Sequence, residues 1–159
     1  MKETVGSGVV IRPAQAADAA EVYKLVTSIL QEEFPADQAA YPPDDLKKLV
    51  ESYAPPNEFL VAVDHSQIVG TCGIKADDSK TAILRRLFVA PIHRCQGVGL
   101  LLLKEALSFC RSRGFQEIII RTSTRMEKAI HLCQKLGFKE GGRWAMGSVT
   151  LIQFHLRLT

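Results

Sequence analysis

Two glycines and an arginine lie where a strand-like segment passes into a long helical one, between Arg94 and Leu100. The first N–H groups of a helix have no partner within it, and they point at one spot that the helix dipole makes positive. Gly97 and Gly99 lack the Cβ atoms that would block a phosphate, and Arg94 can add a charge-assisted hydrogen bond. The segment therefore predicts a cradle for a pyrophosphate group.

Two familiar phosphate-binding loops do not match this segment. Leu100, Leu101 and Leu102 follow the glycines, so the third glycine of the dinucleotide-binding fingerprint is missing. A Gly-Lys-Ser/Thr sequence, which a Walker loop needs, does not occur in the chain. The alternative is a glycine-containing helix start that binds no ligand.

Hydrophobic periodicity predicts the elements that hold this loop. Apolar residues three and four apart predict helices over 18–30, 44–53, 98–113 and 125–136. Asp18 is the expected N-cap of the first helix, Glu21 completes a capping box, and a segment with three prolines follows over 31–43. Apolar or alternating runs predict strands over 9–11, 59–63, 67–74, 81–89, 116–122 and 149–158.

The order of these elements predicts the sheet. Three successive strands with short connections, 59–63, 67–74 and 81–89, predict an antiparallel meander. The strand over 116–122 follows a helical crossover, so it is expected to pair in parallel with 81–89. Since the sequence contains no linker or repeat, residues 1–159 are expected to form one mixed α/β (α+β) domain.

The composition is typical of a soluble globular protein with a substantial core, because 47% of the 159 residues are hydrophobic and 23% are charged. No apolar run approaches the roughly 20 residues that cross a bilayer, and residues 1–4 lack an apolar signal region. We therefore expect a cytoplasmic protein without a membrane partner. The four cysteines have neither CxxC nor zinc-finger spacing, so reduced thiols and no metal site are expected.

Charge is unevenly distributed along the chain. Residues 1–93 carry a net charge of −4, and residues 94–159 carry one of +7. A basic half suits an anionic ligand, whereas an acidic half suits a cationic one. The alternative is that both halves are ordinary solvated surface.

Several segments together resemble the GNAT superfamily of N-acetyltransferases. Residues 94–99 (RCQGVG) are similar to its R/Q-x-x-G-x-G/A signature, and residues 84–91 (LRRLFVAP) are similar to its central strand. Residues 129–138 (AIHLCQKLGF) resemble its last helix and the following strand, and residues 11–14 with Asp18 resemble its opening. The resemblance covers nearly the whole chain and implies a GNAT domain, with a mostly antiparallel sheet, a splayed central parallel pair and helices on both faces.

The resemblance also implies that acetyl-coenzyme A (acetyl-CoA) is the cosubstrate. The backbone of Leu87, Phe88 and Val89 would pair with the pantetheine arm, where the sheet parts between the strands ending at Val89 and Thr122. Backbone amides of residues 94–99 would hold the pyrophosphate, and an N–H near Val89 would face the developing oxyanion. The implied cofactor-binding residues are Leu87, Phe88, Val89, Arg94, Cys95, Gln96, Gly97, Val98, Gly99 and Leu100.

Acyl transfer to an amine needs a base for the ammonium proton, donors for the oxyanion and an acid for the leaving thiolate. Many family members use a tyrosine as this acid, and Cys133 occupies its position. A thiol with a pKa of about 8.5 can donate a proton; the alternative is that Cys133 is a small buried hydrophobe. Met126 replaces the family's asparagine, and Ile83 or Leu84 replaces its strand glutamate.

Glu33 is the candidate base, because it lies in the proline-rich segment where the family shapes its acceptor pocket. The alternative is a solvent-exposed loop acid. His93 is expected to face solvent or a phosphate of CoA, and Tyr41 either lines the acceptor site or only packs. A chain of water molecules can replace any single base.

The predicted function is transfer of an acetyl group from acetyl-CoA to a primary amine of a small molecule, by direct attack in a ternary complex. The acidic stretch over 32–45 is hypothesised to favour a cationic amine, such as an amino acid, a polyamine or an amine drug. The alternatives are acetylation of a protein lysine or N-terminus, and a non-catalytic acyl-CoA-binding regulatory module. No nucleic-acid partner is expected, because the chain has no aromatic-basic cluster, and a homodimer is left open.

Overall fold

The computed structural model describes residues 4–5 and 8–158. Its strands are β1 (Thr4–Val5), β2 (Val9–Pro13), β3 (Glu58–Asp64), β4 (Gln67–Ala76), β5 (Thr81–Val89), β6 (Glu117–Ser123), β7 (Lys139–Met146) and β8 (Val149–Arg157). Its helices are α1 (Ala19–Glu33), α2 (Asp44–Lys47), α3 (Leu49–Ser52), α4 (Val98–Ser112) and α5 (Glu127–Lys135). Three 3-10 turns are η1 (Ala16–Asp18), η2 (Pro35–Ala40) and η3 (Pro91–His93).

One sheet carries these strands in the order β1-β2-β3-β4-β5-β6-β8-β7. The strands β3, β4 and β5 form the predicted antiparallel meander, and β5 pairs with β6 in parallel, as the sequence predicts. The other neighbouring strands run antiparallel. This mixed arrangement confirms the expected fold class.

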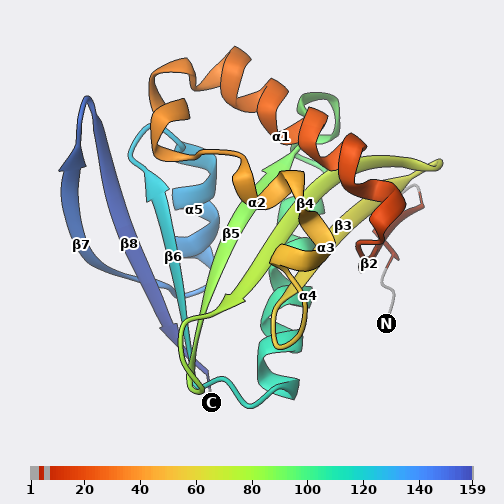
Figure 1. Ribbon diagram of the computed structural model, residues 1–159. Helices are drawn as coiled ribbons and strands as arrows, with labels where there is room; N and C mark the ends of the chain where they lie inside the picture. The colour runs from red at the N-terminus through yellow and green to blue at the C-terminus, as the bar shows by residue number, and fades with distance from the viewer. Residues whose placement is uncertain (1–3, 6–7, 159) are drawn as a thin grey trace.

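The parallel pair stays together over only part of its length. Residues 81–84 of β5 pair with residues 117–120 of β6, and farther along the two strands separate (Figure 1). The β4–β5 register shifts at a bulge beside this parting, where Arg86 has a left-handed φ of 57°. Thr71 Oγ1 on β4 donates a hydrogen bond of 2.6 Å to the Arg86 carbonyl. Because a bulge redirects a strand and its side chains, the sheet opens next to Arg86.

Helices cover both faces of the sheet, as expected (Figure 1). The long helix α4 packs on one face, in a buried apolar cluster that includes Leu102 and Ile118. The helices α1, α2 and α3 pack on the opposite face, in a second cluster that includes Val26 and Phe59. Removing this apolar surface from water stabilises the sandwich of helix, sheet and helix.

The helix predicted over 44–53 is interrupted. The backbone at Lys48 leaves the helical region, with φ −126° and ψ 60°, and this separates α2 from α3. Leu49 is buried, whereas Val50, which the sequence places on the same apolar face, is 51% exposed. The Tyr53 hydroxyl donates to Asp45 at 2.6 Å. Tertiary contacts of this kind, rather than helical periodicity, set the path of the segment.

The predicted capping box at α1 is wrong. Asp18 is already in helical backbone geometry, with φ −82° and ψ −15°, and its side chain makes no cap hydrogen bond. Its carboxylate instead accepts hydrogen bonds from Arg12, at 2.7 and 3.0 Å, and from the Gln15 N–H. Glu21 accepts the Ile68 N–H of β4 at 2.6 Å. Asp18 therefore stands at the predicted N-cap position of α1, but its carboxylate binds Arg12 of β2 and caps η1, and Glu21 binds β4.

The hairpin of β7 and β8 ends the described chain and turns at Gly147, which has a φ of 64°. The alternating tail forms β8 as predicted, whereas β7 is exposed along its whole length. A strand without a buried face has no polar–apolar alternation to mark it. Among the described residues, no helix has both the length and the apolar character needed to cross a membrane.

Candidate functional site

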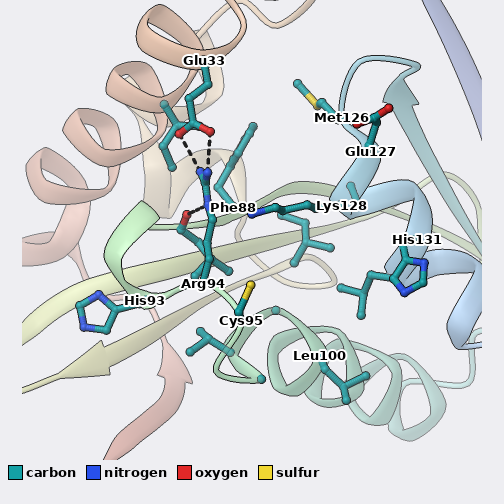
Figure 2. A pocket seen from close by; sticks show the side chains of 18 of the residues that line it. Glu33, Phe88, His93, Arg94, Cys95, Leu100, Met126, Glu127, Lys128 and His131 are labelled. Atoms are coloured by element: carbon teal, nitrogen blue, oxygen red, sulfur yellow. Dashed lines mark hydrogen bonds and ion pairs between the residues drawn. The ribbon is translucent and has the colours of Figure 1, made fainter.

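A cavity of about 480 Å³ lies between the end of α1, the loop before α4 and the start of α5. Ligand sites in proteins commonly occupy about 300–1,000 Å³. Apart from Gln96, every predicted cofactor-binding residue lines this cavity, and so does Glu33 (Figure 2). The structure thus brings the ends of β5 and α1 against the start of α4.

The start of α4 presents free backbone N–H groups to this cavity. The first helical hydrogen bond is donated by Leu101 to the Gly97 carbonyl at 3.0 Å, so the N–H groups just before Leu101 have no place in the helical ladder. Gly97 has a φ of 86°, a region that glycine enters without strain. Cys95 also has a left-handed φ, of 63°, so the loop turns sharply ahead of the helix. This backbone suits an anion at the helix dipole.

Arg94 is bonded on the cavity wall. Its Nε donates to the Val89 carbonyl at 3.0 Å, and its Nη1 and Nη2 donate to the two carboxylate oxygens of Glu33 at 2.5 and 2.8 Å (Figure 2). The hydrogen bonds from Arg94 lower the pKa of Glu33, and burial opposes this shift. A phosphate group that binds Arg94 therefore competes with Glu33 for the guanidinium.

His93 fixes the start of the loop. Its Nε2 lies 3.0 Å from Asp64 Oδ2 at the end of β3, and its side chain is only 14% exposed. His65 Nδ1 lies 2.9 Å from the other carboxylate oxygen of Asp64. His93 is therefore bonded to the β3–β4 turn, and the expectation that it faces solvent is wrong. Because His93 also lines the larger cavity, its contact with a phosphate of CoA stays a prediction.

The helix α5 adds basic side chains that were not assigned to the site from the sequence. Lys128, His131 and Lys135 line the cavity from α5, and Arg125 does so from the turn before it. Their three- and four-residue spacing along α5, which places side chains on one helix face, was the available signal. Together with the start of α4 they suit a ligand that carries several phosphates, such as CoA. Within the described chain, no three His, Cys, Asp or Glu side chains gather as metal ligands.

A second cavity of about 40 Å³ lies in the parting between β5 and β6. Leu87, Phe88, Met126 and Ala129 line both cavities, so the two adjoin. Other lining residues come from β5, from β6 and from Tyr41, which follows η2. This second cavity adjoins the place, at the parting of the two strands, where the sequence resemblance puts the acetyl group and the amine.

Arg86 is a buried residue of the second cavity that sequence reasoning missed. Its Nε and Nη2 donate to the two Asp45 carboxylate oxygens at 3.1 and 2.5 Å, and Nη2 also donates to the Pro42 carbonyl at 2.6 Å. Burial raises the pKa of Asp45, but hydrogen bonds from Arg86 and Tyr53 outweigh burial and leave it below the ordinary value. Two adjacent arginines within an otherwise apolar strand were the signal that strand alternation fails here.

Arginines pair with three of the five acidic residues in the stretch over 32–45. Asp37 is fully buried and accepts hydrogen bonds from Ser123 at 2.9 Å and from Arg125 at 2.6 Å. Glu33 and Asp45 have their own arginine partners. Pairing therefore reduces the free negative charge behind the hypothesis of a cationic acceptor, and the exposed Glu32 and Asp44 carry what remains.

The sequence profile of the acetyltransferase (GNAT) family matches residues 23–138. The chain belongs to this family. Among its GNAT relatives, human N-acetyltransferase 8 is 36% identical over 90 residues, which cover 54% of this chain and 40% of that protein. Probable N-acetyltransferase 14 of Xenopus tropicalis is 32% identical over 112 residues, which cover 69% of this chain and 54% of that protein. The chain thus spans about half the length of the curated relatives it matches.

Solved GNAT structures share the fold. An acetyltransferase of the GNAT family from Staphylococcus aureus Mu50 superposes with a TM-score of 0.82 at 23% identity, covering 96% of this chain and 100% of that chain. An acetyltransferase from Salmonella typhimurium, solved with its cofactor acetyl-CoA, superposes with a TM-score of 0.72 at 18% identity. The superposition covers 95% of this chain and 94% of that chain. At these identities the likeness establishes the GNAT fold.

Cys133, at the position of the GNAT tyrosine, is 0% exposed in the cluster under α4. It is not among the residues that line either cavity. Burial raises the pKa of its thiol to about 12, so the group stays protonated, but away from the cavities. Its role as an acid stays a prediction, and this placement favours the alternative of a small buried hydrophobe. Met126, at the asparagine position, does line both cavities.

Proposed function

We propose that this GNAT chain transfers an acetyl group from acetyl-CoA to a primary amine of a small molecule, by direct attack in a ternary complex. The observation that carries the proposal is the pair of adjoining cavities at the parting of β5 and β6. The larger one contains the free N–H groups of α4, and the smaller one has room for a small chemical group only. A reaction between two bound molecules needs this kind of shared boundary.

The chain's own groups fit acetyl-CoA along this boundary. The N–H groups that precede Leu101 and the side chains of Lys128 and Lys135 would hold its phosphates. Beyond residue 84, β5 remains paired with β4 but no longer pairs with β6, so on that side it offers backbone groups to the pantetheine arm, as an edge strand does. When bound, acetyl-CoA supplies a thioester whose carbonyl carbon gains a bond to the acceptor nitrogen as the carbon–sulfur bond breaks.

The amine must lose a proton and the departing sulfur must gain one. Glu33 lines the larger cavity and is the predicted base, but its hydrogen bonds to Arg94 and its lowered pKa make it a weak acceptor near neutral pH. Glu33 must therefore separate from Arg94 before it takes the proton, or water carries the proton from the amine to solvent. The proposal includes either route, and the amine attacks directly in both.

Release of the CoA thiol from acetyl-CoA tests the proposal. Purified protein would be assayed with a panel of small primary amines, with lysine-containing peptides and with peptides bearing free N-termini. Thiol release with small amines but not with peptides is expected. Release with peptides alone would favour a protein acetyltransferase, and thermal stabilisation by acetyl-CoA without any thiol release would favour a regulatory module. If the protein binds neither CoA nor acetyl-CoA, all three functions are contradicted: the small-molecule enzyme, the protein acetyltransferase and the regulatory module.

A further inference from the structure

Two buried polar atoms in the second cavity lack partners. Within the part of the chain that the structure describes, neither Arg86 Nη1 nor Tyr41 Oη has a hydrogen-bond partner. The Arg86 side chain is only 2% exposed, so solvent does not replace the missing partner. Buried donors are nearly always paired in folded proteins, and two unpaired ones that line the same cavity indicate a ligand.

The fold sets the arginine donor in place. The bulge at Arg86 turns its guanidinium toward α2, where Asp45 and the Pro42 carbonyl engage Nε and Nη2. The remaining nitrogen, Nη1, has no partner, and its direction is fixed because the guanidinium cannot rotate without breaking three hydrogen bonds. Such a fixed donor is suited to recognising one acceptor position.

The tyrosine is a donor too. Burial raises the pKa of Tyr41 to about 12, and the nearby Asp37 charge acts in the same direction. Thr122 and Ser123 lie beside the hydroxyl without reaching hydrogen-bond geometry. At neutral pH, Tyr41 is therefore protonated and offers its O–H to a ligand.

Two donors and a surplus of positive charge select an anion. Arg85, Arg86 and Arg121 line this cavity, and none of the described carboxylates lines it directly. The two nearby carboxylates each have an arginine partner, since Asp45 is bound to Arg86 and Asp37, which acts on Tyr41, is bound to Arg125. An ammonium group would face the Arg86 guanidinium, which cannot accept a hydrogen bond and carries the same charge, whereas a carboxylate accepts from both Nη1 and Oη. One buried water needs roughly 10–15 Å³, so the cavity of about 40 Å³ has room for the three heavy atoms of a carboxylate.

We propose that Arg86 and Tyr41 bind a carboxylate of the acceptor, and that the acceptor class is amino acids. The inference rests on the proposed acetyl transfer. The two cavities share Leu87 and Phe88, so a carboxylate held in the smaller one lies beside the place of the acetyl group. An α-amino acid carries its amine on the same carbon as its carboxylate, which brings the amine to that boundary.

Matched acceptors test this inference. The best acceptor among the twenty common amino acids would be compared with its carboxamide and with the amine left by its decarboxylation. The measured quantity is the ratio of kcat/KM for the amino acid to kcat/KM for its carboxamide. The carboxamide keeps one accepting oxygen but loses the negative charge, and its NH2 group replaces the second acceptor with a donor. A ratio of at least about tenfold is therefore expected in the wild-type protein.

Tyr41→Phe is the decisive variant, because Arg86 also holds Asp45 and its replacement can unfold the chain. Removing a buried hydroxyl that has no partner is expected to leave the melting temperature unchanged or raised. The ratio is expected to fall at least about threefold in Tyr41→Phe. Tyr23→Phe, which removes a hydroxyl from α1 outside both cavities, should leave the ratio unchanged.

The outcomes are separable. A wild-type ratio near one overturns the carboxylate site while acetyl transfer stands. The site is also overturned if Tyr41→Phe lowers kcat/KM equally for the amino acid and its carboxamide, which would mean that Tyr41 acts on the acetyl group. If no amine is acetylated, the proposed function fails, and binding of amino acids to the CoA complex decides the inference alone. Calorimetric binding that Tyr41→Phe weakens supports the site, and no binding of any amino acid overturns it.

Discussion

The ion pair between Arg94 and Glu33 places two residues with predicted roles in direct competition. Arg94 is expected to bind the pyrophosphate and Glu33 to act as a base. In the structure, however, the Arg94 guanidinium donates hydrogen bonds to both carboxylate oxygens of Glu33. Their side chains are 21% and 28% exposed, so the pair is close to a surface ion pair in strength, about 1 kcal/mol or less. A phosphate of CoA that binds Arg94, as predicted, would therefore displace Glu33 at a modest cost in free energy.

Glu33→Gln should tighten the binding of CoA. The substitution releases Arg94 and removes a negative charge beside the cradle, and about 1 kcal/mol corresponds to roughly a fivefold lower Kd. Calorimetry with CoA measures this change. Glu32→Gln removes the same charge from the exposed neighbouring residue and should change the Kd less than about twofold. An unchanged or weaker affinity in Glu33→Gln would refute the competition, and a fall in kcat of about a hundredfold would identify Glu33 as the base.

Cys133→Ala separates packing from catalysis. Because the thiol lies in the core, its loss should lower the free energy of unfolding by about 1 kcal/mol, while kcat stays within about twofold. Chemical denaturation and steady-state kinetics give the two numbers. The predicted acid role would instead produce a loss of kcat of about tenfold or more in a variant of unchanged stability.

At the scale of the elements, the geometry of the loop before α4 depends on glycine conformation. Gly97→Ala should lower the affinity for CoA at least about tenfold, because alanine resists the φ of 86° and shifts the N–H groups of the cradle. It should also cost about 1 kcal/mol of stability. Calorimetry with CoA and chemical denaturation measure the two effects.

A glycine at the other end of the same helix provides the control for Gly97→Ala. Gly114 has a φ of 84°, and no neighbouring atom lies within 4 Å of the position that a Cβ would take there. Its replacement by alanine therefore introduces the same backbone strain away from the cavity. Gly114→Ala should lose similar stability and keep the CoA affinity. Equal CoA affinities for the two variants would show that the cradle does not depend on Gly97.

The elements that sequence predicted well are those with one buried face. The strand over 81–89 matches β5 at both ends and the helix start at Val98 matches α4, because apolar periodicity and the glycine pair both mark the junction. The exposed strand β7 and the interrupted segment of α2 and α3 lack such a mark. There, hairpin pairing and the contact between Tyr53 and Asp45 decide the structure.

At the scale of the whole molecule, the loop and helix start expected to form the cradle were predictable, and the second cavity was not. The cradle is local, since its loop and helix are contiguous in the chain. The cavity instead joins Tyr41, β5 and β6, and its arginine is aimed by a bulge that pairing between strands creates. The contacts of Arg86 with Pro42 and Asp45 cross more than forty residues, and no periodicity in one sequence encodes such a pairing.

The same long-range pair couples the stability of the fold to pH. The pKa of Asp45 is lower in the folded chain than its ordinary value, so its carboxylate stabilises the fold above the unfolded pKa of about 3.9. This stabilisation is lost as the pH falls through the pKa that Asp45 has in the folded chain. At neutral pH, Asp45→Asn leaves the Arg86 charge buried without its partner, which costs about 3 kcal/mol, or about 10 °C in Tm for a chain of this size.

Thermal unfolding of the wild-type and Asp45→Asn proteins between neutral pH and about pH 3 checks this coupling. The difference in Tm should be largest near neutral pH and should shrink in the acid range, because protonation then removes the same charge from the wild-type protein. Asp44→Asn changes the exposed neighbour on α2 and should stay within about 2 °C of the wild type throughout. A difference in Tm that persists unchanged into acid would mean that the Arg86–Asp45 ion pair is not what joins α2 to the bulge of β5.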